Sequence, residues 1–93
     1  MALEKIVRNI PASSWSAASE KLIDIILNSP NASKMPSELA KTILYHWQRG
    51  QLVTETGLEC LLEASVILEP EKTISSLEEL GLSEIAAKLK EKL

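Results

Sequence analysis

The chain has 93 residues, of which 45% are hydrophobic and 25% charged, and its formal net charge at pH 7 is −3. This length suits one domain with a modest core, and this composition is typical of a folded globular protein and not of a disordered one. The negative charge has the wrong sign for a protein whose main task is to neutralise nucleic-acid phosphates.

Apolar residues recur at helical spacing in six stretches, and no stretch alternates with the period of two that a strand requires. The first predicted helix covers Leu3 to Ile10 and ends at Pro11. The second begins at Trp15, after Ser13 or Ser14 as its cap. Its apolar stripe is broad, because Ile23 and Leu27 widen it. A broad stripe predicts a central, heavily covered helix.

The third predicted helix lies between Pro36 and Gly50 and carries both a start and a stop signal. Proline suits the first helical position, where its missing N–H is not needed. Glycine is the preferred left-handed residue after a helix. Leu44 lies on the apolar stripe of this helix, so we expect it in the core.

Three more helices follow a short connector. Thr56 and Glu59 have the spacing of a capping box for the fourth helix. Pro70 is suited to open the fifth helix, Gly81 to end it, and Ser83 to cap the sixth. We find no repeat and no linker that divides the chain. The sequence therefore predicts one domain over residues 1–93, a compact all-α bundle of about six short helices.

Side chains that would carry catalysis or bind a metal are scarce. The chain has one His and one Cys, His46 and Cys60, too few for a structural zinc site. Cys60 follows Glu59 in an apolar helical stretch, which favours a small core residue over a thiol nucleophile activated by His46. Glu59 and Glu63 are one turn apart, but no Glu-x-x-His partner accompanies them. We expect no enzyme activity, no cofactor and no metal.

Two patterns offer a DNA-binding alternative. The third and fourth helices have the order of a helix-turn-helix, although the second of them would present acidic residues to the phosphates. Residues 77–89 resemble a helix-hairpin-helix in their hydrophobic-Gly-hydrophobic centre at Gly81. In that family a second glycine lets backbone amides approach a phosphate. Here Ser83 holds that place and Glu84 follows, so we expect at most weak or indirect nucleic-acid contact.

Three aromatic residues are the candidates for an interaction surface: Trp15, Tyr45 and Trp47. Both tryptophans lie on the apolar stripes of their helices, so core packing and interface contact are alternatives for each. A small domain rich in apolar residues leaves part of them uncovered. We therefore predict partner binding through Trp15, Tyr45 and Trp47.

The sequence carries no pattern of a secretory signal, and its apolar runs are too short to cross a bilayer. We expect a cytoplasmic protein that does not contact a membrane.

Residues 14–22 and 44–50 are similar to segments of the small, Lys/Glu/Ile/Leu-rich helical proteins of thermophilic archaea. Within that group, the chain resembles the second small accessory subunit of the archaeal B-family DNA polymerase in size, acidity and helical character. The resemblance implies a non-catalytic subunit that docks on a larger replication enzyme. We expect a protein-interaction module with a larger protein as its partner, and a second copy of the chain as the alternative partner.

Overall fold

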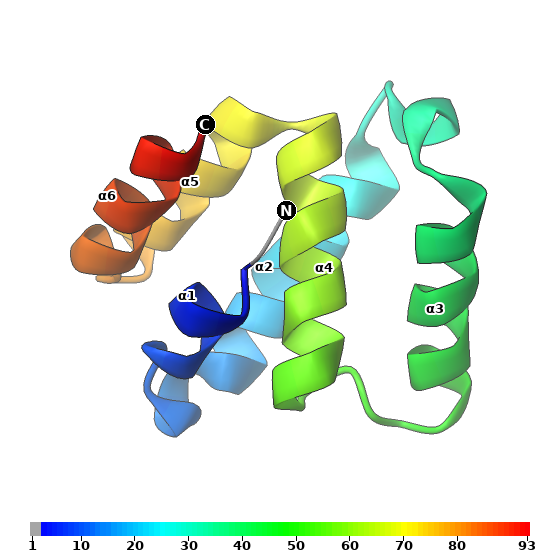
Figure 1. Cartoon of the computed structure of the whole chain (residues 1–93), viewed down its shortest axis with the longest axis horizontal. Helices are drawn as coiled ribbons and strands as arrows, with labels where there is room; N and C mark the ends of the chain where they lie inside the picture. Colours follow the sequence, from blue (N-terminus) through cyan, green and yellow to red (C-terminus); the bar gives the residue numbers. More distant parts are fainter. Residues whose placement is uncertain (1–2) are drawn as a thin grey trace.

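The computed structural model describes residues 3–93 and has six α-helices and two short 3-10 turns in that range, with no strand (Figure 1). The α-helices are α1 (Glu4–Arg8), α2 (Trp15–Asn28), α3 (Ser37–Gln48), α4 (Glu55–Leu68), α5 (Pro70–Glu79) and α6 (Ser83–Lys92). The 3-10 turns are Ala12–Ser14 and Ala32–Lys34, on either side of α2. The predicted all-α bundle of six short helices is confirmed.

Helix α4 is the centre of the fold, because α1, α2, α3 and α5 all pack on it (Figure 1). Eight of its fourteen residues are buried. The prediction that α2 would be a central, heavily covered helix is wrong, since α2 buries only Ala18, Ser19 and Leu22. Helices α4 and α5 both pack on α2, and its broad stripe extends beyond the surface that they cover, since Leu27 is exposed.

The core is built almost entirely from aliphatic side chains of α1, α2, α4, α5 and α6. Its largest fully buried apolar members are Leu3, Ile6, Val7, Leu22, Leu58, Leu61, Leu62, Leu77 and Leu89. Burying one such side chain stabilises the fold by about 1.5–3 kcal/mol. On the opposite side of α4 from this core, helix α3 contributes no buried residue.

Several helix boundaries follow the predicted end signals. Gly50 and Gly81 both have positive φ, at 66° and 79°, so they close α3 and α5 in the left-handed conformation as expected. Pro70 occupies the first turn of α5, also as expected. Pro36 lies one place further out than predicted, at the cap position before Ser37. Ser83, which was predicted to cap α6, is instead the first residue of this helix, and Leu82 holds the cap position.

The capping box predicted at Thr56 is wrong by two residues. Thr54 is the cap of α4, and its hydroxyl oxygen accepts a hydrogen bond from the Gly57 amide at 3.0 Å. Thr54 has the extended backbone that a cap residue needs, with φ of −137° and ψ of 167°, whereas Thr56 is already inside the helix.

The sequence predicts Leu44 in the core. This prediction is wrong, because 46% of the surface of Leu44 is exposed. Helix α3 packs on α4 and on no other helix. One neighbouring helix covers only a narrow strip of α3, where Leu39, Ile43 and His46 are half-buried. The rest of the apolar stripe of α3 faces solvent.

No helix in residues 3–93 has the length and apolar character required to cross a bilayer.

Candidate protein-interaction site

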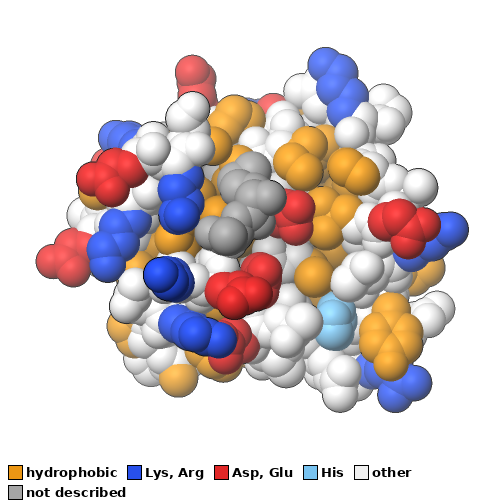
Figure 2. All heavy atoms as spheres, in the orientation of Figure 1, with side chains coloured by type: hydrophobic (Ala, Val, Ile, Leu, Met, Phe, Trp, Pro, Cys, Tyr) orange, Lys and Arg blue, Asp and Glu red, His pale blue; other side chains and the backbone are white. Residues whose placement is uncertain are grey.

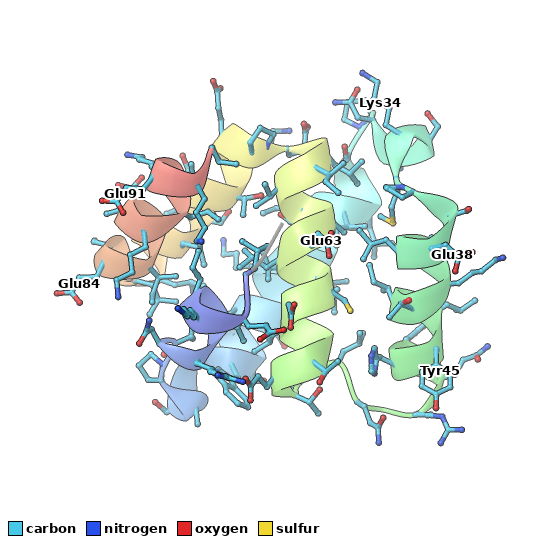
Figure 3. All side chains as sticks on the ribbon, viewed as in Figure 1. Lys34, Glu38, Tyr45, Glu63, Glu84 and Glu91 are labelled. Atoms are coloured by element: carbon cyan, nitrogen blue, oxygen red, sulfur yellow. The ribbon has the colours of Figure 1, made fainter. Side chains whose placement is uncertain are left out.

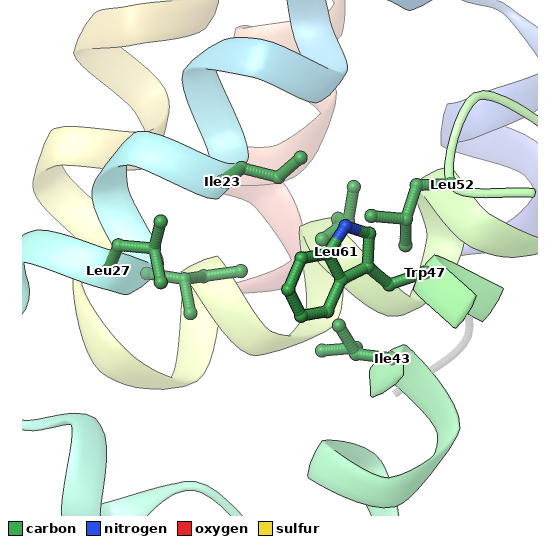
Figure 4. Close-up of a pocket in the computed structure, with 7 residues that line it drawn as sticks. Ile23, Leu27, Ile43, Trp47, Leu52 and Leu61 are labelled. Atoms are coloured by element: carbon green, nitrogen blue, oxygen red, sulfur yellow. The ribbon is translucent and has the colours of Figure 1, made fainter. Parts of the chain in front are cut away.

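Helices α2 and α3 both pack on α4 but not on each other, and this arrangement leaves an open groove between them. The groove has a volume of about 190 Å³. All of its lining side chains are apolar, and we call this set the apolar groove: Ile23, Ile26, Leu27, Ile43, Trp47, Leu52 and Leu61 (Figure 4).

The two walls of the apolar groove each end in a large exposed side chain. Leu27 on the α2 wall is 75% exposed, and Trp47 on the α3 wall is 66% exposed. Leu61 of α4 forms the floor and is 1% exposed. In Figure 4 the Trp47 indole lies over the groove between Ile43 and Ile23. The groove is thus an apolar surface whose rim is accessible and whose base belongs to the core.

A second hollow continues the groove past Trp47, and we call it the polar hollow. Ile23, Trp47 and Leu52 line both cavities. The polar hollow adds Ser16, Ser19, Glu20, Gly50 and Val53 and has a volume of about 290 Å³. Among residues 3–93, Glu20 is the only charged residue that lines either cavity.

The three predicted anchor residues lie in three different settings. Trp15 is half-buried against the core, and its indole Nε1 donates a hydrogen bond to the Ile10 carbonyl oxygen at 2.9 Å. Tyr45 is 51% exposed on the outer side of α3, away from α4 (Figure 3), and the Arg49 guanidinium carbon lies 4.6 Å from the centre of its ring. Only Trp47 lines the apolar groove.

The sequence alone gives only one signal for the other groove residues. Ile23 and Leu27 widen the apolar stripe of α2. An apolar stripe broader than one packing partner covers leaves a free edge. Leu52 gave no signal, because it lies in the irregular connector before α4.

His46 and Cys60 lie on the facing helices α3 and α4, but no hydrogen bond joins them in the structure. His46 Nδ1 is buried and has no hydrogen-bond partner among residues 3–93. Burial, followed by the negative charges of Glu59 and Glu63, raises the pKa of the Cys60 thiol. A raised pKa keeps this thiol protonated at neutral pH, which is the opposite of what a nucleophilic cysteine needs.

Carboxylates gather on the outer side of α4 near its N-terminal half. Glu55 pairs with Arg8 of α1, with 2.6 Å between Oε1 and Nε. Partial burial, followed by repulsion from Glu4 and Glu63, raises the pKa of the Glu59 carboxyl group. Within residues 3–93, no group of three or more His, Cys, Asp or Glu side chains has the geometry to hold a metal ion.

The two DNA-binding patterns have different geometries. In the helix-turn-helix alternative α4 would enter the major groove, yet α4 is the helix with the most buried side chains. In the hairpin alternative α5 and α6 meet at Gly81, and Ser83 and Glu84 are exposed at the start of α6. Three exposed lysines follow on α6: Lys88, Lys90 and Lys92. A carboxylate therefore stands where this hairpin would approach a phosphate.

Comparison with known proteins finds no matching family model, no similar curated protein and no similar solved structure.

Proposed function

We propose that this chain is a non-catalytic protein-interaction module that docks on a larger protein through the apolar groove. The observation that carries the proposal is the gap between α2 and α3, which leaves Leu27 and Trp47 exposed above an apolar floor. Amphipathic helices bind such grooves by inserting apolar side chains at successive turns. A helix laid on α4 would complete the packing that α2 and α3 begin.

Burial of the exposed groove side chains supplies the driving force for docking. Trp47 brings a large apolar area at a low cost in side-chain entropy, and residues of this kind dominate many interfaces. Within residues 3–93 the Trp47 indole N–H donates no hydrogen bond, so this donor is available to a partner. Trp15 differs, because its N–H is already bonded within the chain. We assign the anchor role to Trp47, with Tyr45 on the neighbouring outer face of α3.

The larger protein that we propose is a replicative B-family DNA polymerase in the cytoplasm. The resemblance of residues 14–22 and 44–50 to segments of small archaeal helical proteins supports this choice. In such a complex the chain contributes binding surface and no catalytic residue.

Co-elution with the purified B-family polymerase of the same host on size-exclusion chromatography tests this function. The unmodified chain is expected to co-elute, and Leu27→Asp is expected to abolish co-elution by placing a charge in the groove. Leu27 is 75% exposed, so this change leaves the fold intact. Leu93→Asp is the matched control, because Leu93 is 57% exposed at the end of α6, on the other side of the molecule.

Two results would contradict the proposal in different ways. Normal co-elution of Leu27→Asp would show that the polymerase binds elsewhere than in the apolar groove. Failure of the unmodified chain to co-elute would show that this polymerase is not the partner.

A further inference from the structure

The polar hollow differs in character from the apolar groove that it extends. Trp47 of α3 lines it on one side, and Ser16, Ser19 and Glu20 of α2 line it on the other. An aromatic face attracts a cation through its quadrupole, and a carboxylate attracts it through its charge. Both attractive groups line one cavity at the end of the proposed docking groove.

The Glu20 carboxylate has no cationic partner within residues 3–93. The neighbouring cation on α2, Lys21, pairs with Glu79 of α5 at 3.4 Å on another side of the helix. On α3, Lys41 pairs with Glu38 at 3.8 Å, and Arg49 lies over the ring of Tyr45. Since no Lys or Arg lines either cavity, the negative charge at this end of the groove is not balanced locally.

We propose that the polar hollow binds the guanidinium of an arginine carried by the docked helix, one turn beyond the apolar residues that fill the groove. This inference rests on the proposed function, because it names the chemistry of the segment that docks. The occupant is therefore a basic amphipathic helix of the partner protein.

Arginine fits this cavity better than lysine does. Its planar guanidinium stacks on an indole while its N–H groups donate to a carboxylate in two parallel hydrogen bonds. An ammonium group is a compact, strongly hydrated charge and cannot stack in this way. The hydroxyl group of the exposed Ser16 can accept a hydrogen bond from a remaining N–H donor.

Synthetic helical peptides provide the test. The probe is an alanine-based helix with leucines at positions i, i+3 and i+7 and one arginine a turn beyond the last leucine. Its matched versions carry glutamine or glutamate in place of the arginine. Isothermal titration calorimetry is expected to give a Kd for the arginine peptide about 5–30-fold lower than for the glutamine peptide. The advantage is expected to shrink as salt is added.

Substitutions at Glu20 separate the charge from the rest of the site. With Glu20→Gln the preference for arginine is expected to fall below about threefold, and with Glu20→Arg the glutamate peptide becomes the tightest binder. Glu84→Gln is the control, because Glu84 lies on α6 and lines neither cavity (Figure 3). This variant is expected to keep the full preference for arginine.

The failure of this inference and the failure of the proposed function give different results. Equal affinity for the arginine and glutamine peptides would overturn the arginine site and leave the docking groove in place. If no peptide binds and Leu27→Asp still loses co-elution with the polymerase, the basic helix is not the occupant. The docking groove itself would remain supported. Self-association of the chain that Leu27→Asp abolishes, seen by analytical ultracentrifugation, would assign the groove to a second copy and overturn both.

Discussion

Gly57, in the first turn of α4, lies against the backbone that leads into this helix. A Cβ atom at this position would be 2.7 Å from the Leu52 carbonyl oxygen and 2.8 Å from the Leu52 Cα, and it would also overlap the Gln51 carbonyl oxygen. Alanine favours helix over glycine by about 1 kcal/mol, but backbone atoms cannot move aside as a flexible side chain does. The steric overlap is therefore expected to outweigh the gain in helix propensity when Gly57 is replaced by alanine.

Gly57→Ala is expected to lower the free energy of unfolding by about 1–3 kcal/mol, the usual cost of overpacking. Urea denaturation measures it. Thr56→Ala, at the exposed neighbouring position, is the control and is expected to change stability by less than about 0.5 kcal/mol. A stabilised Gly57→Ala variant would show that the connector does not lie against α4 as described.

Glu59 gives a prediction about pH, because its carboxyl group has a raised pKa in the folded protein, caused first by burial and then by Glu4 and Glu63. A raised pKa means that the folded state holds the proton more tightly than the unfolded state does, so this group lowers stability as pH rises through the range of glutamate titration. Glu59→Gln is expected to raise stability at pH 7 by up to about 1 kcal/mol, since solvent screens a partly exposed group. Well below the usual glutamate pKa the gain should vanish.

Denaturation of both proteins across this pH range measures the effect, with Asp24→Asn, at an exposed position within α2, as the control. A gain for Glu59→Gln that persists unchanged in acid would contradict an electrostatic cause.

Helix α4 shows that a local sequence signal predicts the start of a helix to within one turn but does not identify the cap residue itself. Threonine occurs at both 54 and 56, and only Thr56 is followed three residues later by the glutamate of a capping box, yet Thr54 is the cap. Thr54→Ala is expected to cost about 0.5–2 kcal/mol, because it removes the acceptor for the Gly57 amide. Thr56→Ala should cost much less in the same urea titration. Equal losses in the two variants would mean that the cap is not at Thr54.

The sequence does not predict how much of the apolar stripe of helix α3 is buried by neighbouring helices. Its start, stop and stripe are local features, and they predict its length well: Pro36 and Gly50 flank Ser37–Gln48. How many helices pack on that stripe depends on residues distant in the chain. The core assignment of Leu44 failed for this reason, because periodicity identifies an apolar face and not the neighbour that covers it.

Leu44→Ala is therefore expected to lower the free energy of unfolding by about 1 kcal/mol, since nearly half of the Leu44 surface is already exposed to water. Leu62→Ala, at a core position with 1% exposure, should cost about 2–5 kcal/mol. Thermal and urea denaturation compare the two variants. A loss above about 2 kcal/mol for Leu44→Ala would place this residue in a closed core and contradict its exposed position on α3.

On the scale of the whole molecule, the site arises from packing order and not from any motif. From the sequence, Trp47 is either an interface anchor or a core residue, and the separation of α2 from α3 leaves its side chain exposed. Trp15, which has the same local pattern, is half-buried and bonded to Ile10. Two tryptophans with the same sequence pattern thus have different surroundings, because Trp15 packs against the core and Trp47 lines an open groove.

The distribution of charge over the molecule bears on nucleic-acid binding. Figure 2 shows Lys and Arg side chains interspersed with Asp and Glu on the face in view, without a continuous basic field there. The net charge is −3, and the exposed Glu84 precedes the three lysines of α6 in the sequence. Phosphate neutralisation needs clustered cations and gains its energy from released counterions. This surface offers few such clusters.

We therefore expect the isolated chain to bind duplex DNA no more tightly than about 10⁻⁴ to 10⁻⁶ M at physiological salt, the range of non-specific binding. Fluorescence anisotropy with a labelled duplex measures this affinity, and a salt titration gives the number of phosphate contacts. Any weak binding should disappear when Lys88, Lys90 and Lys92 are replaced together by glutamine, because these exposed lysines lie on α6, the helix that follows the hairpin at Gly81. Tight, sequence-selective binding that survives this triple replacement would contradict the prediction and favour the DNA-binding alternative over a module that acts by protein contact.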